Sequence, residues 1–265
     1  MGTAPVPLKM NGITEVLTSE VVKLVVGQGD GQKTFYIHKE LFQSKAPVFD
    51  KMFGGSFKEA LTGSAALPDD TCEAFEIFSK WLYLSMTEHT NLIILDLVPR
   101  PLTCKIRWQL IETIVFADKY CIDELSDLIM SVWMRFQKDG LPIMELKKIT
   151  SYIVANCANR CKARDFFALT WASVMLQNPG EGHYIPIGTD LDAFINDNDF
   201  AKQVIKGMSS LACRTNDGWQ RLCDYHLHGR SVFCYELRTR VHINPPESVG
   251  GKTSVPNPAK KRQLA

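Results

Sequence analysis

The first part of the chain combines short apolar runs with turn residues, a pattern typical of a small sheet surrounded by helices. The β-branched run Val21–Val26 predicts a strand that is buried on both faces. The glycine-rich segment 27–32 predicts a tight turn in which an Asp-Gly pair supplies the positive φ, and the alternating residues 35–37 predict the returning strand. We therefore expect a β-hairpin over residues 20–37.

Helical spacing of apolar residues follows this hairpin. Two short helices are expected on either side of Pro47, because proline fixes φ and disfavours helical geometry in the residue before it. Residues 65–67 predict a third short strand, and the Pro-Asp-Asp sequence after them predicts the start of a capped helix. That helix would bury an aromatic-rich stripe, which consists of Ala74, Phe75, Phe78, Trp81 and Leu82.

Helical patterns dominate the rest of the chain. Amphipathic helices are predicted over residues 108–120 and 123–136. Three more helices are expected to begin at Pro142, Asp165 and Asp199, because proline suits the first turn of a helix and aspartate caps its amino-terminal end.

Changes of pattern divide the chain into four parts. Residues 1–18 lack strong periodicity and predict a flexible lead or a first short helix. Residues 19–136 are predicted to form one α+β domain, within which residues 88–102 carry a Pro-Arg-Pro breaker and are interpreted as an insertion. A mainly α-helical region is expected over residues 137–243. The tail of residues 244–265 is rich in Pro, Gly and Ser, which predicts disorder.

Composition narrows the classes of function. The chain has 265 residues, of which 45% are hydrophobic and 22% charged, and its formal net charge is +1. This balance creates no overall field that would attract nucleic acid or an anionic membrane, so neither partner is expected. The eight cysteines lie mostly in apolar segments, and no secretory signal opens the chain. These features favour reduced thiols in a cytoplasmic or nuclear protein.

Several short motifs occur in an order that resembles a known family. They read FYIHKELF, SKAPVF, LPDD, AFEIFSKWLY and ADKY, and they begin at Phe35, Ser44, Leu67, Ala74 and Ala117. This order is similar to that of BTB/POZ domains, particularly the divergent kind that is abundant in filamentous fungi. The resemblance extends over residues 19–136. It implies a small mixed sheet flanked by a helical cluster, and a function in protein–protein interaction, with itself or with another protein.

The resemblance also implies where a partner would bind. BTB adaptors for cullin-type ubiquitin ligases carry a hydrophobic-x-Glu motif, which the residues from Phe57 to Glu59 match. The preceding helix ends in Met52 and Phe53, which we include in the predicted partner surface. A few such anchors decide an interface. The alternative is that Phe57 folds back over the core and that Glu59 starts a turn.

Three further residues match positions of the family. Glu20 and Lys45 stand where the family often carries Asp and Arg, which form a charged pocket at the dimer groove of some transcription factors. Because lysine lacks the bidentate geometry of arginine, a surface charge pair worth under about 1 kcal/mol is the preferred interpretation. His38 matches a structural histidine and is predicted to hydrogen-bond its own backbone and to orient the turn.

One segment near the carboxy-terminal end contains metal-type side chains. Cys223, His226 and His228 form one tight group, and Cys213 and Cys234 lie farther from it in sequence. Zinc takes four nitrogen or sulfur ligands that usually come from two closely spaced pairs. Packed thiols and imidazoles are therefore the preferred interpretation, and no cofactor or metal is expected.

Cys157 and Cys161 are four residues apart in a predicted helix and are interpreted as thiols of a helical core. No nucleophile elbow, paired carboxylates or His-Cys arrangement is legible, so we expect no catalytic residues, no enzyme activity and no small-molecule substrate.

Three hypotheses about function remain. The first is an interaction protein of BTB type, in its sharpest form a substrate adaptor for a cullin ubiquitin ligase. The second is a regulator of transcription or chromatin, which would use the basic residues 260–262 for nuclear import. The third is a zinc-binding domain or a zinc enzyme built on the group between Cys213 and Cys234.

Overall fold

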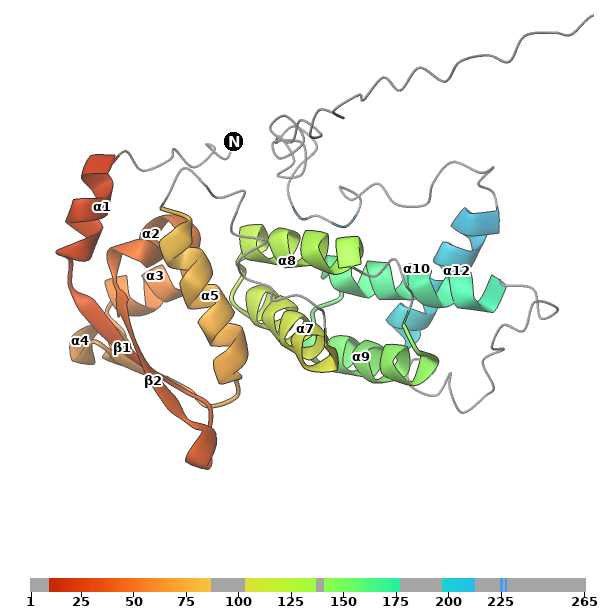
Figure 1. Cartoon of the computed structure of the whole chain (residues 1–265), viewed down its shortest axis with the longest axis horizontal. Helices are drawn as coiled ribbons and strands as arrows, with labels where there is room; N and C mark the ends of the chain where they lie inside the picture. Colours follow the sequence, from red (N-terminus) through yellow and green to blue (C-terminus); the bar gives the residue numbers. More distant parts are fainter. Residues whose placement is uncertain are drawn as a thin grey trace, which may run out of the picture.

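The structure is a computed structural model, and it describes residues 10–86, 103–136, 141–176 and 197–212 together with Tyr225 and Leu227. The described chain is a mixed α and β fold that is mostly helical. The sheet and the helices next to it, formed by residues 10–86, lie at one end of the molecule (Figure 1). The helices formed by residues 104–212 make up the other end.

A three-stranded mixed sheet forms the β part of the fold. Strands β1 (Val21–Val26) and β2 (Lys33–His38) form the predicted hairpin, and β3 (Ser64–Leu67) pairs with β1 in parallel. The order β2-β1-β3 places β1 in the centre. Burial alternates along β1, and Val21 at its start is exposed. The prediction that this strand is buried on both faces was therefore wrong, because helices cover only one face of the sheet.

The connection between β1 and β2 also differs from the expected tight turn. A 3-10 turn over Gly29–Gly31 joins the two strands. The positive φ angles belong to Gly27, at 84°, and Gly29, at 58°, rather than to the pair Asp30 and Gly31. A connection of this length distributes the reversal over several residues, so a two-residue hairpin turn is not needed.

Five helices belong to the part of the molecule that contains the sheet. They are α1 (Met10–Leu17), α2 (Glu40–Lys45), α3 (Pro47–Gly54), α4 (Lys58–Thr62) and α5 (Cys72–Leu84). The separation of α2 from α3 at Pro47 is confirmed, and this proline takes the first position of α3. The hydroxyl of Thr71 caps α5 by accepting a hydrogen bond from the N–H of Ala74. Of the two alternatives expected for residues 1–18, the first short helix is present as α1, and its residue Val16 is buried.

Aromatic rings fill the interior between these helices. Phe42 stacks on Phe49 and on Phe53, with ring centroids 5.2 and 5.8 Å apart. The predicted stripe of α5 is confirmed, because all five of its residues are buried. Its central residue Phe78 contacts the rings of Phe49 and Phe116 at 5.4 and 5.0 Å. This interior therefore continues into the first helix of the other part of the molecule.

The second part of the described chain contains helices only. They are α7 (Cys104–Lys119), α8 (Asp123–Phe136), α9 (Ile143–Asn156), α10 (Lys162–Leu176) and α12 (Asn198–Ala212). The start of α9 after Pro142 is confirmed. Two expected caps were wrong. Asp165 lies within the first turn of α10, and Asp197 rather than Asp199 accepts the N–H of Phe200 at the start of α12.

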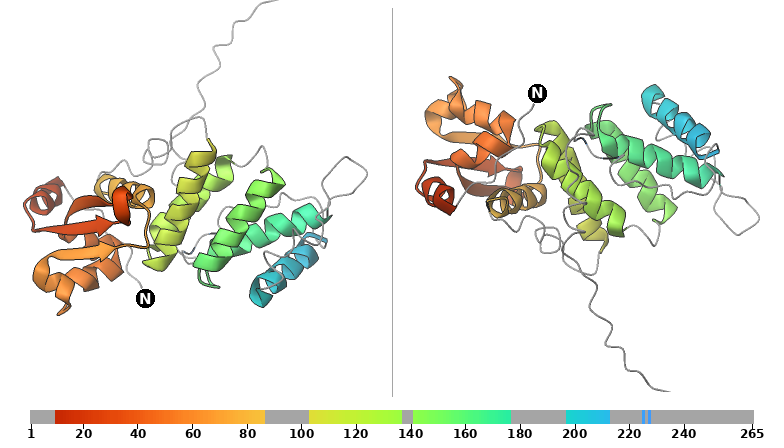
Figure 2. Two further views of the ribbon diagram at one scale, coloured as in Figure 1. Left: turned by 90° about the horizontal axis from the view of Figure 1, so that it is seen from below. Right: turned by 90° about the horizontal axis from the view of Figure 1, so that it is seen from above.

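Helices on both sides of the predicted boundary at residue 136 pack together (Figure 2). Arg107 of α7 donates two hydrogen bonds, of 2.8 and 2.9 Å, to the carboxylate of Glu145 on α9. The rings of Trp133 on α8 and Phe167 on α10 are 5.8 Å apart. The buried hydrophobic residues form one continuous cluster, so this boundary does not separate two cores. The proposed insertion over residues 88–102 and the tail 244–265 lie outside the described residues.

None of the helices in the described ranges combines the length and the apolar character that a bilayer span requires.

Candidate functional site

Two large apolar side chains are exposed where the loop after α3 leads into α4. Phe57 directly precedes α4, and its side chain is 59% exposed. Leu61 lies one helical turn later and is 84% exposed, and its N–H donates a 3.3 Å hydrogen bond to the carbonyl of Phe57. Residues three to four positions apart lie on the same helical face. We call residues 55–62, which carry this apolar pair, the α4 corner.

The backbone of the α4 corner holds the Phe57 ring at the surface. A Cβ atom at Gly55 would lie 3.2 Å from Cδ2 of Phe57 and 2.8 Å from the carbonyl oxygen of Lys51. Glycine is therefore needed for this close approach. Figure 1 shows α4 at the end of the molecule that is remote from α9, α10 and α12. The ring does not fold back over the core, and Glu59 lies in the first turn of α4 rather than starting a turn of its own.

The two candidates at the end of α3 differ in burial. Phe53 is fully buried and stacks on Phe42, so its prediction as a partner contact was wrong. Phe53 follows the buried Phe49 by four positions, which puts both rings on the same inward face of the helix. Met52 is partly buried and packs against the same core.

Glu20 and Lys45 do not form a pair with each other. The carboxylate of Glu20 lies 3.4 Å from the ammonium group of Lys39. Lys45 is largely buried and donates a 2.6 Å hydrogen bond to Glu124 on α8, and its ammonium group lies 5.7 Å from the ring centre of Trp81. The predicted pairing of the first two residues was therefore wrong. Lys45 instead links α2 to α8 across the two parts of the molecule.

His38 binds a side chain of α5 rather than its own backbone. Its Nδ1 atom is 2.8 Å from the hydroxyl of Tyr83, and the two rings meet edge to face with centroids 5.9 Å apart. The same hydroxyl accepts a 3.4 Å hydrogen bond from the N–H of His38. These contacts join the end of β2 to α5, which is a structural arrangement.

Two of the motifs that carry the family resemblance contact each other. The carboxylate of Asp70, in LPDD, is buried and accepts two 3.0 Å hydrogen bonds from Lys119, in ADKY. It also accepts a 2.6 Å hydrogen bond from the hydroxyl of Tyr120. Burial, followed by this hydrogen bond, raises the pKa of Tyr120 well above its usual value. The phenol therefore remains a donor across the physiological pH range.

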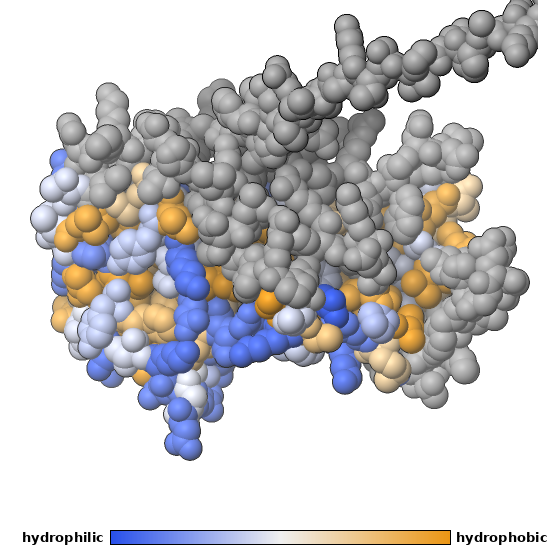
Figure 3. Space-filling model, in the orientation of Figure 1, coloured by the Kyte–Doolittle hydropathy of each residue, from blue (hydrophilic) through white to orange (hydrophobic). Residues whose placement is uncertain are grey.

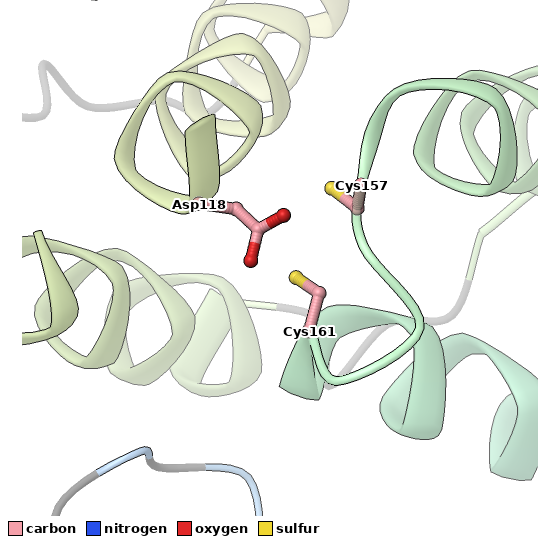
Figure 4. Close-up of side chains that lie close together, drawn as sticks. All are labelled: Asp118, Cys157 and Cys161. Atoms are coloured by element: carbon pink, nitrogen blue, oxygen red, sulfur yellow. The ribbon is translucent and has the colours of Figure 1, made fainter. Parts of the chain in front are cut away.

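A second group of reactive side chains lies where α7 meets the turn between α9 and α10. One ligand atom from each of Asp118, Cys157 and Cys161 lies within 4.8 Å of the others (Figure 4). Asp118 belongs to the last turn of α7, Cys157 follows α9, and Cys161 precedes α10. Both cysteines are buried, and Asp118 is half-buried. We call these three residues the thiol cluster.

Hydrogen bonds orient the members of the thiol cluster. The N–H of Ala158 donates a 2.8 Å hydrogen bond to Oδ2 of Asp118. The hydrogen bond between the two thiols raises the pKa of Cys157 and lowers that of Cys161. Backbone N–H groups at the start of α10 also lower the pKa of Cys161. The cysteines lie on a turn between two helices, so their placement in a single helix was wrong.

The thiol cluster could not be assembled by sequence reasoning. The short spacing between Cys157 and Cys161 is evident from the sequence. Asp118, however, belongs to the ADKY motif far upstream. The five cysteines of the described residues are all free thiols. The proximity of Asp118 to the two cysteines depends on how α7 packs on α9, and spacing along the sequence does not indicate this packing.

The metal-type group near the carboxy-terminal end lies outside the described residues. Its members are Cys213, Cys223, His226, His228 and Cys234. Two of their neighbours are described. Tyr225 is buried, with its ring 5.2 Å from that of Phe166, and the N–H of Leu227 donates to Asp127 on α8. This segment therefore touches both α8 and α10.

Comparison with known proteins adds no relative, since no protein-family model and no curated protein matches the chain.

Proposed function

We propose that the protein is an interaction module of BTB type and that it acts as an adaptor for a cullin ubiquitin ligase through the α4 corner. The observation that carries this proposal is the exposed pair Phe57 and Leu61. Burial of such side chains against a partner removes apolar surface from water at about 25 cal/mol per Å². Anchors of this kind dominate many interfaces.

The chemistry of the α4 corner favours a protein as the partner. An exposed aromatic ring beside an exposed leucine offers hydrophobic contact in the centre of an interface, where charged groups are depleted. Glu59 lies between the two in sequence, in the first turn of α4. Figure 3 shows hydrophobic residues among polar ones on the surface of the end of the molecule that contains the sheet.

The contact between LPDD and ADKY supports the assignment to the BTB type. Asp70 and the pair Lys119 and Tyr120 are about 50 residues apart in the chain, yet they share one buried carboxylate. A chance resemblance of two short motifs gives no reason for such a contact. The small three-stranded mixed sheet, followed by several helices, is also of the kind that the resemblance implies.

An adaptor needs a second surface for the protein that it presents. The helical end of the molecule lies opposite the α4 corner (Figure 2). It exposes Met144 on α9, Leu176 on α10 and Ile205 on α12. A partner bound at the α4 corner leaves this end accessible, which suits a protein that joins two others.

Replacement of Phe57 by alanine tests the proposal. We expect Phe57→Ala to reduce co-purification of a cullin with the full chain at least tenfold, because interface anchors commonly contribute 2 kcal/mol or more, about thirtyfold in affinity. Leu61→Ala should have a smaller effect in the same direction. Thermal stability should not change, since the ring is exposed.

Tyr36→Ala provides the matched control. Tyr36 is an equally exposed aromatic residue, at 64%, but it lies on β2 rather than at the α4 corner. This variant should recover as much cullin as the wild type. Equal recovery by the Phe57 and Tyr36 variants would show that the α4 corner is not the binding surface.

A further inference from the structure

We propose that the thiol cluster of Asp118, Cys157 and Cys161 binds a zinc ion, which fastens the end of α7 to the turn between α9 and α10. This inference is independent of the adaptor function, because the cluster and the α4 corner belong to different ends of the molecule. No other group of three metal-type ligands of this closeness occurs among the described residues.

The spacing of the ligand atoms suits a small tetrahedral ion. Zinc binds sulfur at about 2.3 Å, so two sulfur ligands of one tetrahedral ion are about 3.8 Å apart. All three ligand atoms already lie within 4.8 Å of one another. In Figure 4 the two thiols and the carboxylate point toward a common space between the helices. Small side-chain rotations are enough to close the coordination.

The chemistry of the ligands selects zinc over the hard cations. Two thiolates and one carboxylate form a set that zinc accepts, whereas magnesium and calcium require oxygen ligands. Binding releases the proton of each thiol, since the metal binds the thiolate. The product carries two thiolates, one carboxylate and Zn²⁺, and therefore a single net negative charge, with a water molecule as the fourth ligand.

The surroundings of the thiol cluster provide the orientation that metal sites use. The N–H of Ala158 holds one oxygen of Asp118, and a carboxylate has enough lone pairs to keep this bond and bind a metal. This hydrogen bond orients one of the three ligands before a metal arrives.

The three ligands come from separate elements, which gives the site a structural role. Asp118 ends α7, and the two cysteines flank the turn that reverses the chain between α9 and α10. An ion bound to all three would hold these helices at one point. The expected consequence is a stability that depends on metal.

Metal analysis of the full chain tests the proposal. The wild-type protein, incubated with ZnCl₂ and then desalted, should carry at least about one zinc per chain by mass spectrometry of the elements. The double variant Cys157→Ser, Cys161→Ser should carry about one zinc fewer than the wild type. Cys104→Ser, at an exposed cysteine outside the cluster, should not differ from the wild type.

A second measurement does not depend on the folding of the double variant. Asp118→Asn keeps both thiols, and we expect it to bind zinc at least tenfold more weakly in a competition titration with a chelating dye. X-ray absorption at the zinc edge of the wild type should show sulfur and oxygen ligands together.

Three results would overturn the proposal. One is a wild-type chain without zinc after the incubation. Another is that the wild type and the double variant carry the same amount of zinc, while a separate Cys223→Ser variant carries less. The last is a Cys157–Cys161 disulfide that forms in place of metal binding under the same conditions.

Discussion

The two ends of the molecule have interiors of different chemistry. Between the sheet and its helices, Phe78 touches five other aromatic rings, with centroid distances from 5.0 to 6.5 Å. The helical end buries polar side chains as well, whereas Asp70 is the one buried polar residue among those of residues 10–86 whose burial the structure describes. Those of the helical end are Thr113, Ser126, Asp127, Ser131, Thr150 and Arg164.

This difference separates two ways of specifying a fold. Ring packing depends on volume and shape, and a neighbouring ring can shift to fill part of a gap. A buried polar group must find its partner at a fixed distance and angle, since an unpaired one costs about 1–3 kcal/mol. The aromatic end should therefore lose stability gradually with lost volume, and the helical end abruptly with a lost partner.

The largest loss in the free energy of unfolding is expected for Phe78→Ala. Truncation of a buried phenylalanine costs about 3–5 kcal/mol of the free energy of unfolding, and this ring packs on α2, α3, α5 and α7. Denaturation by urea would measure the loss, and Phe78→Leu should recover more than half of it. A loss below 1 kcal/mol would show that the rings do not support this end.

The second largest loss in the free energy of unfolding is expected for Arg164→Met. Arg164 is buried and donates hydrogen bonds to the carbonyl of Val154 at 2.8 Å and to the carboxylate of Asp197 at 2.9 Å. We expect a loss of about 2–3 kcal/mol, less than for a fully buried ion pair, because the Asp197 side chain is 29% exposed.

Hydrogen exchange would show whether this loss is local. Amide protection should fall in α12, where Asp197 caps the first turn, and remain unchanged in β1. Arg160→Met, at an exposed arginine in the turn before α10, is the control and should stay within about 0.5 kcal/mol of the wild type. Equal effects of the two variants would mean that the buried hydrogen bonds do not specify this end.

The smallest expected effect on stability is a pH dependence that arises from Glu112, on the side of α7 that faces the start of α5. Burial raises its pKa, although the hydroxyl of Thr71 donates a 3.3 Å hydrogen bond to it. A raised pKa in the folded state means that the contribution of this group to stability is fully present below its ordinary value of 4.5 and is lost as the pH rises.

Glu112→Gln should therefore melt at a slightly higher temperature than the wild type at about pH 7 and at the same temperature near pH 4. Thermal denaturation followed by circular dichroism across this range would measure the difference. Glu40→Gln, at an exposed glutamate of α2, serves as the control. A lower melting temperature of the Glu112 variant at neutral pH would contradict the assignment of burial as the dominant cause.

Sequence patterns predicted the aromatic end well because its determinants are local. The spacing of rings in α5, the break at Pro47 and the alternation in β2 each depend on a few adjacent residues. Phe53 was wrongly predicted to lie on the surface because it precedes the Phe57 motif, whereas its four-residue spacing from Phe49 indicated the buried face of α3. Leu61 was overlooked, although it follows Phe57 by four positions.

Contacts between residues that are far apart in the chain could not be predicted from the sequence. The contacts of Lys45 with Glu124 and of Arg107 with Glu145 join residues that are 79 and 38 positions apart. The thiol cluster needs Asp118 opposite a turn that lies some 40 residues downstream. Such partners follow from how helices cross, which periodicity alone does not determine.

The most direct measurement is the dissociation constant between the full chain and a purified cullin amino-terminal domain, determined by calorimetry for the wild type and Phe57→Ala. The account predicts saturable binding of the wild type and a dissociation constant at least tenfold higher for the variant. A wild-type chain that shows no heat of binding, or two dissociation constants within a factor of about two, would contradict it.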